Sequence, residues 1–393
     1  MATYEEELEN LLREELDAVH ERERNTFDRL LAEANGRIVL FGAGNLGRKA
    51  LRCLRSIGIE PLAFADNNQA RWGSETDHLA ILSPEIAVSR YGDCALFVVT
   101  IWSLGHTFRE THAKLTSLGC RTVLPSSTLR WKFAAELLPD YCQDLPHKLF
   151  EQADEVRAAA RLWADEESRI EYLNQVRWRA LGDYACLRGP HREEQYFPES
   201  LFRLIPGEVF VDCGAYDGDT AKRFISRDAE FAKLLAIEPD PDNFRRLRQW
   251  AENQGEPGNR ILTYGLAVGV SVGSVRFDAT GAEAACIAPE GGVLVECAPL
   301  DKLVGDAVPT YIKMDVEGAE QDALEGARQL IQTHAPILAV CLYHRLSDLW
   351  RIPLLIRSLC GGYKLFLRPH GYEGRELVCY AVPPHRLRPE VSA

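Results

Sequence analysis

Residues 211–220 read VDCGAYDGDT, and this stretch decides the fold of the second half of the chain. A short apolar run from residue 208 leads into it, and a helical pattern follows at residues 221–227. The pattern predicts a strand, a tight turn and a helix, in which Gly214 and Gly218 let a ligand approach the backbone. Because the first N–H groups of such a helix favour a carboxylate or phosphate, the turn predicts a nucleotide-like ligand.

An acidic residue stands where the ribose of such a ligand would lie. Glu238 ends the next apolar run, about 20 residues beyond the turn, which is the spacing typical of a ribose-binding acid. The turn lacks the GxGxxG pattern, and it carries Asp212 and Asp217. These acids disfavour a pyrophosphate and favour a cationic ligand such as S-adenosylmethionine.

Composition excludes several classes of protein. The 393 residues exceed one ordinary domain, and a 46% hydrophobic content is enough for real cores. A net charge of −13 argues against nucleic acid or an anionic membrane as partner. The 11 cysteines include no CxxC pair and no metal-ligand spacing, and no apolar run reaches 18 residues. These features predict a cytoplasmic protein without a membrane segment.

The chain divides into four predicted parts. An amphipathic helix occupies residues 1–35, and a Rossmann-like α/β domain of nucleotide-binding type occupies residues 36–130. A helical connector spans residues 131–205, with helices at 151–161 and 165–180, and the second α/β domain spans residues 206–393. Apolar residues between 4 and 33 recur at helical spacing, so this helix either packs on its own domain or forms a homodimer.

Residues 42–47 read GAGNLG, a GxGxxG turn between a predicted strand at 37–41 and a predicted helix at 45–57. Its glycines are Gly42, Gly44 and Gly47. Asp66 ends the second strand, 19 residues after Gly47, at the distance expected for a ribose contact. Two interpretations stay open, a nucleotide or nucleotide-sugar site and a Rossmann-like scaffold without a ligand. Further strands are expected at 61–65, 95–100 and 121–124.

The second domain is predicted to be a doubly wound sheet of seven strands that alternate with helices. The predicted strands are 208–212, 234–238, 261–266, 310–315, 336–342, 363–368 and 377–382. The predicted helices are 219–227, 241–253, 318–332 and 346–358. The long stretch 269–304 is expected to be a lid or a hairpin insertion.

Polar residues follow two of these strands. Asp315 and Glu317 stand beyond the fourth strand, and His344 beyond the fifth. Because ligands lie at the carboxyl ends of such strands, the three are candidate catalytic residues. His344 can act as a general base near neutral pH, and the two acids can orient it or bind a divalent ion. The sequence requires no metal, and a cap or an ion pair with Lys313 would also explain the acids.

Arg368 and His370 end the sixth strand and are candidate substrate-binding residues. Both side chains can bind an anionic or polyol substrate. A structural role at the sheet is the alternative.

Five stretches of the chain, in this order, resemble the FkbM-type methyltransferases. They are VDCGAYDGDT, IEPDPDNFRRL, YIKMDVEGAEQDALEGA, CLYHRLSDLWRIPLL and YKLFLRPH. The resemblance covers residues 206–382 and implies a class I methyltransferase that uses S-adenosylmethionine. It implies methylation of a hydroxyl group on a sugar, glycan, carrier-linked or secondary metabolite. The residues then expected at the cofactor are Asp212, Gly214, Ala215, Asp217, Gly218, Glu238, Ala267 and Asp315.

Two other functions remain open from the sequence. The GxGxxG turn also suits an NAD(P)-dependent oxidoreductase or a sugar-nucleotide-binding protein. The third interpretation is a non-enzymatic scaffold. The acids and the histidine at the strand ends argue against it.

Overall fold

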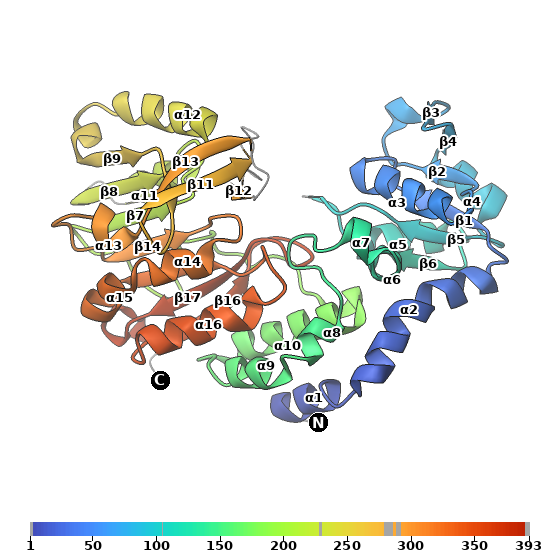
Figure 1. The fold of residues 1–393 in the computed structure, drawn as a ribbon, viewed down its shortest axis with the longest axis horizontal. Helices are drawn as coiled ribbons and strands as arrows, with labels where there is room; N and C mark the ends of the chain where they lie inside the picture. Colours follow the sequence, from blue (N-terminus) through green and yellow to red (C-terminus); the bar gives the residue numbers. More distant parts are fainter. Residues whose placement is uncertain (1–2, 104, 228–229, 279–285, 288–291, 390–393) are drawn as a thin grey trace. The chain divides into compact units, whose positions relative to one another are not determined.

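The computed structural model describes residues 3–103, 105–227, 230–278, 286–287 and 292–389 (Figure 1). The chain divides into two compact units. Unit 1 consists of Met1–Asp154, Glu171–Gly189 and Gly371–Arg375, and unit 2 of Glu155–Ile170, Pro190–His370 and Glu376–Ala393. Within the described ranges, none of the helices combines the length and the apolar character needed to cross a membrane.

Unit 1 begins with two helices, α1 (Tyr4–Leu11) and α2 (Leu16–Glu33), where the sequence predicts one. The break falls at an acidic pair. Glu14 binds the guanidinium of Arg22 with its carboxylate (Oε2···Nη2 2.6 Å), and Glu15 is the extended N-cap of α2. Acids at this position are favourable because they face the positive end of the helix dipole.

The apolar side of α2 is buried within unit 1. Val19 and Phe27 are fully buried, and Phe27 belongs to the core that covers one face of the first sheet. The packing of the helix on its own domain is thus observed. Formation of a homodimer stays a prediction.

A six-stranded sheet forms the centre of unit 1, in the order β3-β4-β2-β1-β5-β6. Its strands are β1 (Ile38–Phe41), β2 (Ala63–Ala65), β3 (Glu75–Thr76), β4 (Leu79–Leu82), β5 (Leu96–Val99) and β6 (Val123–Pro125). All pairs are parallel except β3 with β4. The sequence predicts β1, β2, β5 and β6. It misses β3, which has two residues, and β4, in which alternate residues are buried.

Helices cover this sheet and continue beyond it. They are α3 (Asn45–Ser56), α4 (Pro84–Tyr91), α5 (Phe108–Ser117), α6 (Ser127–Lys132), α7 (Ala134–Leu137) and α8 (His147–Phe150). Then follow α9 (Ala153–Ala160) and α10 (Glu166–Leu181), close to the two helices predicted in the connector. Short 3-10 helices lie at Gln69–Arg71 and Tyr184–Cys186.

Unit 2 contains the predicted seven-stranded sheet, in the order β16-β17-β15-β14-β7-β8-β9. Its strands are β7 (Val209–Cys213), β8 (Lys233–Ile237), β9 (Ile261–Tyr264), β14 (Tyr311–Met314), β15 (Ile337–Cys341), β16 (Lys364–Pro369) and β17 (Leu377–Val382). Only β17 runs against its neighbours. The strand order reverses between β7 and β14, so this is the switch point at which ligands of such sheets bind.

The helices of unit 2 pack on this sheet (Figure 1). They are α11 (Asp219–Arg227), α12 (Pro241–Glu252), α13 (Leu300–Leu303), α14 (Glu320–Glu325), α15 (Arg328–His334) and α16 (Asp348–Leu359), with 3-10 helices at Glu256–Arg260 and Pro384–Arg386. The predicted insertion is a four-stranded sheet of β10 (Ala267–Val268), β11 (Gly273–Asp278), β12 (Cys286–Ile287) and β13 (Val293–Ala298). Residues 279–285 and 288–291 of this insertion lie outside the described residues.

Candidate functional site

The loop between β7 and α11 is shaped by two glycines with positive φ. Gly214 has φ 78°, and a Cβ atom there would lie 1.8 Å from the carbonyl oxygen of Asp315. Gly218 has φ 90°, and a Cβ atom there would lie 2.7 Å from the indole ring of Trp250. Any side chain at either position would therefore displace the chain or its neighbours. Gly214 also brings this loop directly against the end of β14.

A buried ion pair lies beneath this loop. The carboxylate of Asp212 is fully buried, and its Oδ1 lies 3.0 Å from Nζ of Lys313 on β14. The same ammonium donates a hydrogen bond to the carbonyl oxygen of Gly214 (2.6 Å). Burial raises the pKa of Asp212 to about 6, and the charge of Lys313 opposes this rise. Asp212 thus orients the loop through Lys313, whereas the sequence suggested an ion pair of Lys313 with Asp315.

Glu238 follows β8 and holds the loop from the other side. Its Oε2 accepts a hydrogen bond from the N–H of Tyr216 (2.9 Å), and its Oε1 accepts one from the N–H of Asp240 (3.0 Å). Burial raises the pKa of Glu238 to about 7, while these backbone donors act to lower it. Each carboxylate oxygen has a second lone pair, so Glu238 can still accept hydrogen bonds from ribose hydroxyls.

The other predicted cofactor residues lie in different surroundings. Ala215 is buried in the loop, and Asp217 is partly exposed and pairs with Lys222 (3.2 Å). Ala267 lies on β10, in a small apolar cluster with Phe277 and other residues of the four-stranded sheet. The contact of Ala267 with the cofactor stays a prediction.

Asp315, Glu317 and His344 come together at the carboxyl ends of β14 and β15. Nε2 of His344 lies 3.4 Å from Oδ1 of Asp315 and 3.7 Å from Oε1 of Glu317. Ligand atoms of the three residues lie within 4.8 Å of one another, a spacing that a metal ion could occupy. Glu317 has φ 52°, a strained value for a residue with a side chain, and such strain concentrates at functional sites.

Protonation within this cluster differs from that of isolated side chains. Burial alone would lower the pKa of His344, but the carboxylates of Glu320, Glu317 and Asp315 raise it to about 10. Burial raises the pKa of Glu317 to about 8. Burial also opposes ionisation of Asp315, yet Lys313 and His344 hold its pKa below the usual value. The imidazole is therefore protonated at neutral pH, where the sequence suggested a neutral base.

Three residues that the sequence did not single out position this cluster. The hydroxyl of Tyr196 donates to Oδ2 of Asp315 (2.8 Å), and that of Tyr343 donates to Oδ1 (3.2 Å). Oε1 of the fully buried Glu320 lies 2.8 Å from Nδ1 of His344. Glu320 is three residues after Glu317, at the start of α14. This position is the one feature of the sequence that could have indicated its contact with His344.

Comparison with known proteins identifies a domain in the second half of the chain. The family model of the methyltransferase FkbM domain matches residues 212–373. This chain carries a methyltransferase FkbM domain. The match begins at Asp212 beneath the glycine loop and includes the carboxylate–histidine cluster, so both features belong to the FkbM domain.

Two relatives extend the comparison. The crystal structure of methyltransferase FkbM from Methylobacillus flagellatus KT has a TM-score of 0.76 and 23% sequence identity, over 91% of this chain and 93% of that one. At this identity the match establishes the shared fold, which includes the N-terminal α/β part. Hexuronic acid methyltransferase AglP of Haloferax volcanii is 32% identical over 111 residues, which are 26% of this chain. The matched region spans 44% of the length of AglP.

Arg368 and His370 lie in the FkbM domain but do not join the cluster at the strand ends. Arg368 is buried and binds Asp165 (Nη2···Oδ2 2.5 Å) and Oγ of Ser168 (2.8 Å). Nε2 of His370 lies 2.8 Å from the hydroxyl of Tyr380, and burial lowers its pKa to about 4. These contacts are structural, and binding of substrate by either residue stays a prediction.

The GxGxxG turn lies outside the FkbM domain. Like the glycine loop of that domain, it is held by a carboxylate that follows the next strand. Oδ2 of Asp66 accepts a hydrogen bond from the N–H of Ala43 (2.9 Å), much as Glu238 binds Tyr216. The carboxylate of Asp66 therefore holds the loop between β1 and α3. Binding of a nucleotide at this loop stays a prediction.

The glycines of this turn differ in the space around them, which predicts unequal effects of the same substitution. A Cβ atom on Gly47 would lie 1.9 Å from the carbonyl oxygen of Gly42, whereas one on Gly44 would meet no atom within 4 Å. Gly47→Ser should lower the free energy of unfolding by about 1–3 kcal/mol, as overpacking does. Gly44→Ser should change it by less than about 0.5 kcal/mol, because serine also suits the N-cap. Urea denaturation of both variants, followed by circular dichroism, measures this difference, and equal losses would contradict the helix–strand packing role of Gly47.

Proposed function

We propose that this protein is an S-adenosylmethionine-dependent methyltransferase that methylates a hydroxyl group on a sugar, glycan or secondary metabolite. The observation that carries this proposal is the cluster of Asp315, Glu317 and His344, directly beside the glycine loop at the switch point of the sheet. This position combines a nucleotide-type loop with groups that can exchange protons. Transfer of a methyl group to a hydroxyl needs both.

The residues around the loop fit the proposed cofactor. Glu238 offers two carboxylate oxygens to ribose hydroxyls, and Gly214 and Gly218 keep side chains away from the backbone. Oδ2 of the buried Asp212 makes no hydrogen bond to any described residue, so this side of the loop retains an acceptor. When bound, S-adenosylmethionine would supply an electrophilic methyl group on a positively charged sulfur. The acids of this loop favour that charge over the negative charge of a pyrophosphate.

The cluster would remove the proton of the acceptor hydroxyl. A neutral alcohol is a weak nucleophile, so a neighbouring base increases the rate of its attack. The carboxylates of Asp315 and Glu317 raise the pKa of His344, and its charge lowers theirs, so a change of protonation at one of the three affects the others. A divalent ion bound by the same three side chains would serve the same purpose by replacing the proton on the imidazole.

The acceptor class is supported by the similarity to hexuronic acid methyltransferase AglP. A uronic acid is a sugar with several hydroxyl groups and one carboxylate. We therefore expect transfer of labelled methyl groups from S-adenosylmethionine to glycans that contain uronic acids. No transfer to these or to neutral sugars would contradict the sugar part of the proposal, and no binding of the cofactor would contradict all of it.

The cofactor site predicts the effect of one substitution. Glu238→Ala should weaken S-adenosylmethionine binding by roughly 1.5–3 kcal/mol, because it removes hydrogen bonds to a charged acceptor. Calorimetric titration of the full chain measures this loss. Glu252→Ala is the matched control, because Glu252 lies exposed at the end of α12 and pairs there with Arg248. An unchanged affinity in Glu238→Ala would show that the ribose does not lie at Glu238.

A further inference from the structure

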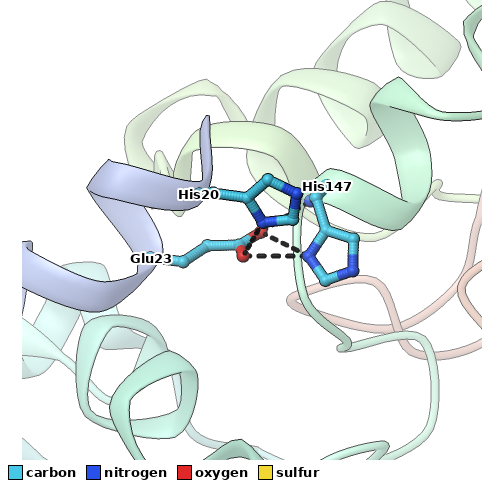
Figure 2. Close-up of side chains that lie close together, drawn as sticks. All are labelled: His20, Glu23 and His147. Atoms are coloured by element: carbon cyan, nitrogen blue, oxygen red, sulfur yellow. Dashed lines mark hydrogen bonds and ion pairs between the residues drawn. The ribbon is translucent and has the colours of Figure 1, made fainter. Parts of the chain in front are cut away.

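Two histidines and a glutamate meet in unit 1, far in sequence from the FkbM domain (Figure 2). His20 and Glu23 lie one turn apart on α2, and His147 is the first residue of α8. Their ligand atoms lie within 4.8 Å of one another. Figure 2 shows both imidazole rings beside the carboxylate of Glu23, with a ring nitrogen of each turned toward it.

Both oxygens of Glu23 lie near Nδ1 of His147, Oε1 at 3.2 Å and Oε2 at 2.9 Å, and they differ in their other contacts. Oε1 accepts a hydrogen bond from the backbone N–H of His147 (2.6 Å), so it fixes the start of α8. Oε2 is the oxygen nearest both rings, 2.9 Å from Nδ1 of His147 and 3.6 Å from Nδ1 of His20. One carboxylate oxygen and two ring nitrogens therefore face a common point.

The charge of Glu23 also favours a cation at this point. Its side chain is only 5% exposed, and burial of a carboxylate without a cation is costly. In the described part of the chain, the ion pairs of Glu23 are with these two histidines. Neither histidine carries a permanent charge, and among the described residues no lysine or arginine forms an ion pair with this carboxylate.

We propose that His20, Glu23 and His147 bind a zinc ion through Nδ1, Oε2 and Nδ1. Imidazole nitrogen and carboxylate oxygen are ligands that zinc prefers, with bonds of about 2.0–2.2 Å in a tetrahedral arrangement. Such bonds place ligand atoms about 3.4 Å apart. The observed separations of 2.9 and 3.6 Å from Oε2 lie on either side of this value. His20 is partly exposed, so water completes the coordination.

The zinc ion would act as a structural link within unit 1. It would join α2 to α8 across 124 residues of chain. The carboxylate of Glu23 already contacts His147 across this distance. A link between distant segments stabilises the folded state because a preformed site rarely exists in the unfolded chain. This role is independent of methyl transfer.

Calorimetric titration of the full, chelator-treated chain with zinc chloride tests the site. The His344→Gln background removes the histidine of the other carboxylate–histidine cluster, so zinc binding there does not contribute. We expect one zinc ion per chain, and His20→Gln should weaken its binding by at least about 100-fold, more than the loss of an outer-shell partner does. His385→Gln is the matched control, because it removes an exposed histidine outside the cluster. Equal zinc affinity in His20→Gln and His385→Gln would overturn the proposal.

Thermal unfolding gives a second readout that does not depend on activity. In the same His344→Gln background, zinc should raise the melting temperature of the His385→Gln chain but not that of His20→Gln, because only an ion that binds the folded state stabilises it. His20→Gln is preferred over a Glu23 variant because Glu23 also binds the backbone of α8. A zinc-independent melting temperature in both variants would show that the three side chains form only a hydrogen-bonded cluster.

Discussion

Replacing His344 with glutamine should lower the turnover number by about 10²- to 10⁴-fold, the usual effect of losing a general base. The imidazole is fixed by Glu320 at Nδ1, and its Nε2 faces Asp315 and Glu317. A glutamine amide has a similar reach but cannot carry the proton. Affinity for S-adenosylmethionine should stay nearly unchanged, because its proposed ribose contact at Glu238 is left intact. Steady-state kinetics and calorimetry together measure this separation.

The pH dependence of turnover should distinguish how the cluster works. Because neighbouring carboxylates raise the pKa of His344 to about 10, the protonated imidazole predominates at pH 7. If the cluster acts without a metal, turnover should rise from pH 7 to pH 10, since the deprotonated groups accept the proton. This rise should be much weaker in His344→Gln. If a divalent ion occupies the cluster, a chelator should abolish activity, and Asp315→Asn should weaken metal binding.

The matched control for this variant is His334→Gln, which removes an exposed histidine on α15 of the same unit. It should keep full activity. Full activity of His344→Gln in the presence of a chelator would contradict both versions of the mechanism. Catalysis would then depend on the alignment of the two substrates alone.

The sequence predicts the helices and strands of this protein well where the signal lies within the element itself. Buried parallel strands are continuous apolar runs, so β7, β8, β14 and β15 can be recognised within one or two residues. The strand-end positions of Asp315 and His344 follow from those strands. Strand β4 reads LAIL and is as long as β14, but alternate residues are buried, and it is not predicted from the sequence.

The sequence does not predict which side chains meet across long distances. Tyr196 reaches Asp315 over 119 residues, and His147 reaches Glu23 over 124. Neither pair has a spacing rule, because the contact depends on how whole elements pack. The pKa of His344 does not follow from the sequence for the same reason, since Glu320 adds to the acids that surround the ring.

Lys313→Met should lower the free energy of unfolding by about 3–5 kcal/mol, the cost of leaving a buried charge without its partner. Lys313 is 2% exposed, and its ammonium is the cation beside the fully buried Asp212. Methionine fills the space of the lysine stem without the charge. Lys364→Met is the matched control, because Lys364 is exposed on β16 of the same sheet, and its loss should stay within about 0.5 kcal/mol. Urea denaturation without cofactor measures both.

The loss in Lys313→Met should also depend on pH. Without the ammonium, burial would hold the pKa of Asp212 above its value in the unfolded chain, so the folded state binds the proton more strongly. Stability of the variant should therefore fall as pH rises from 5 to 8, and the loss relative to the wild type should be smallest at pH 5. Adding Asp212→Leu should restore much of the stability, because removal of both charges leaves none unpaired. A loss that is equal at all pH values and additive in the double variant would mean that Lys313 stabilises the sheet by packing alone, and not by balancing the charge beneath the glycine loop.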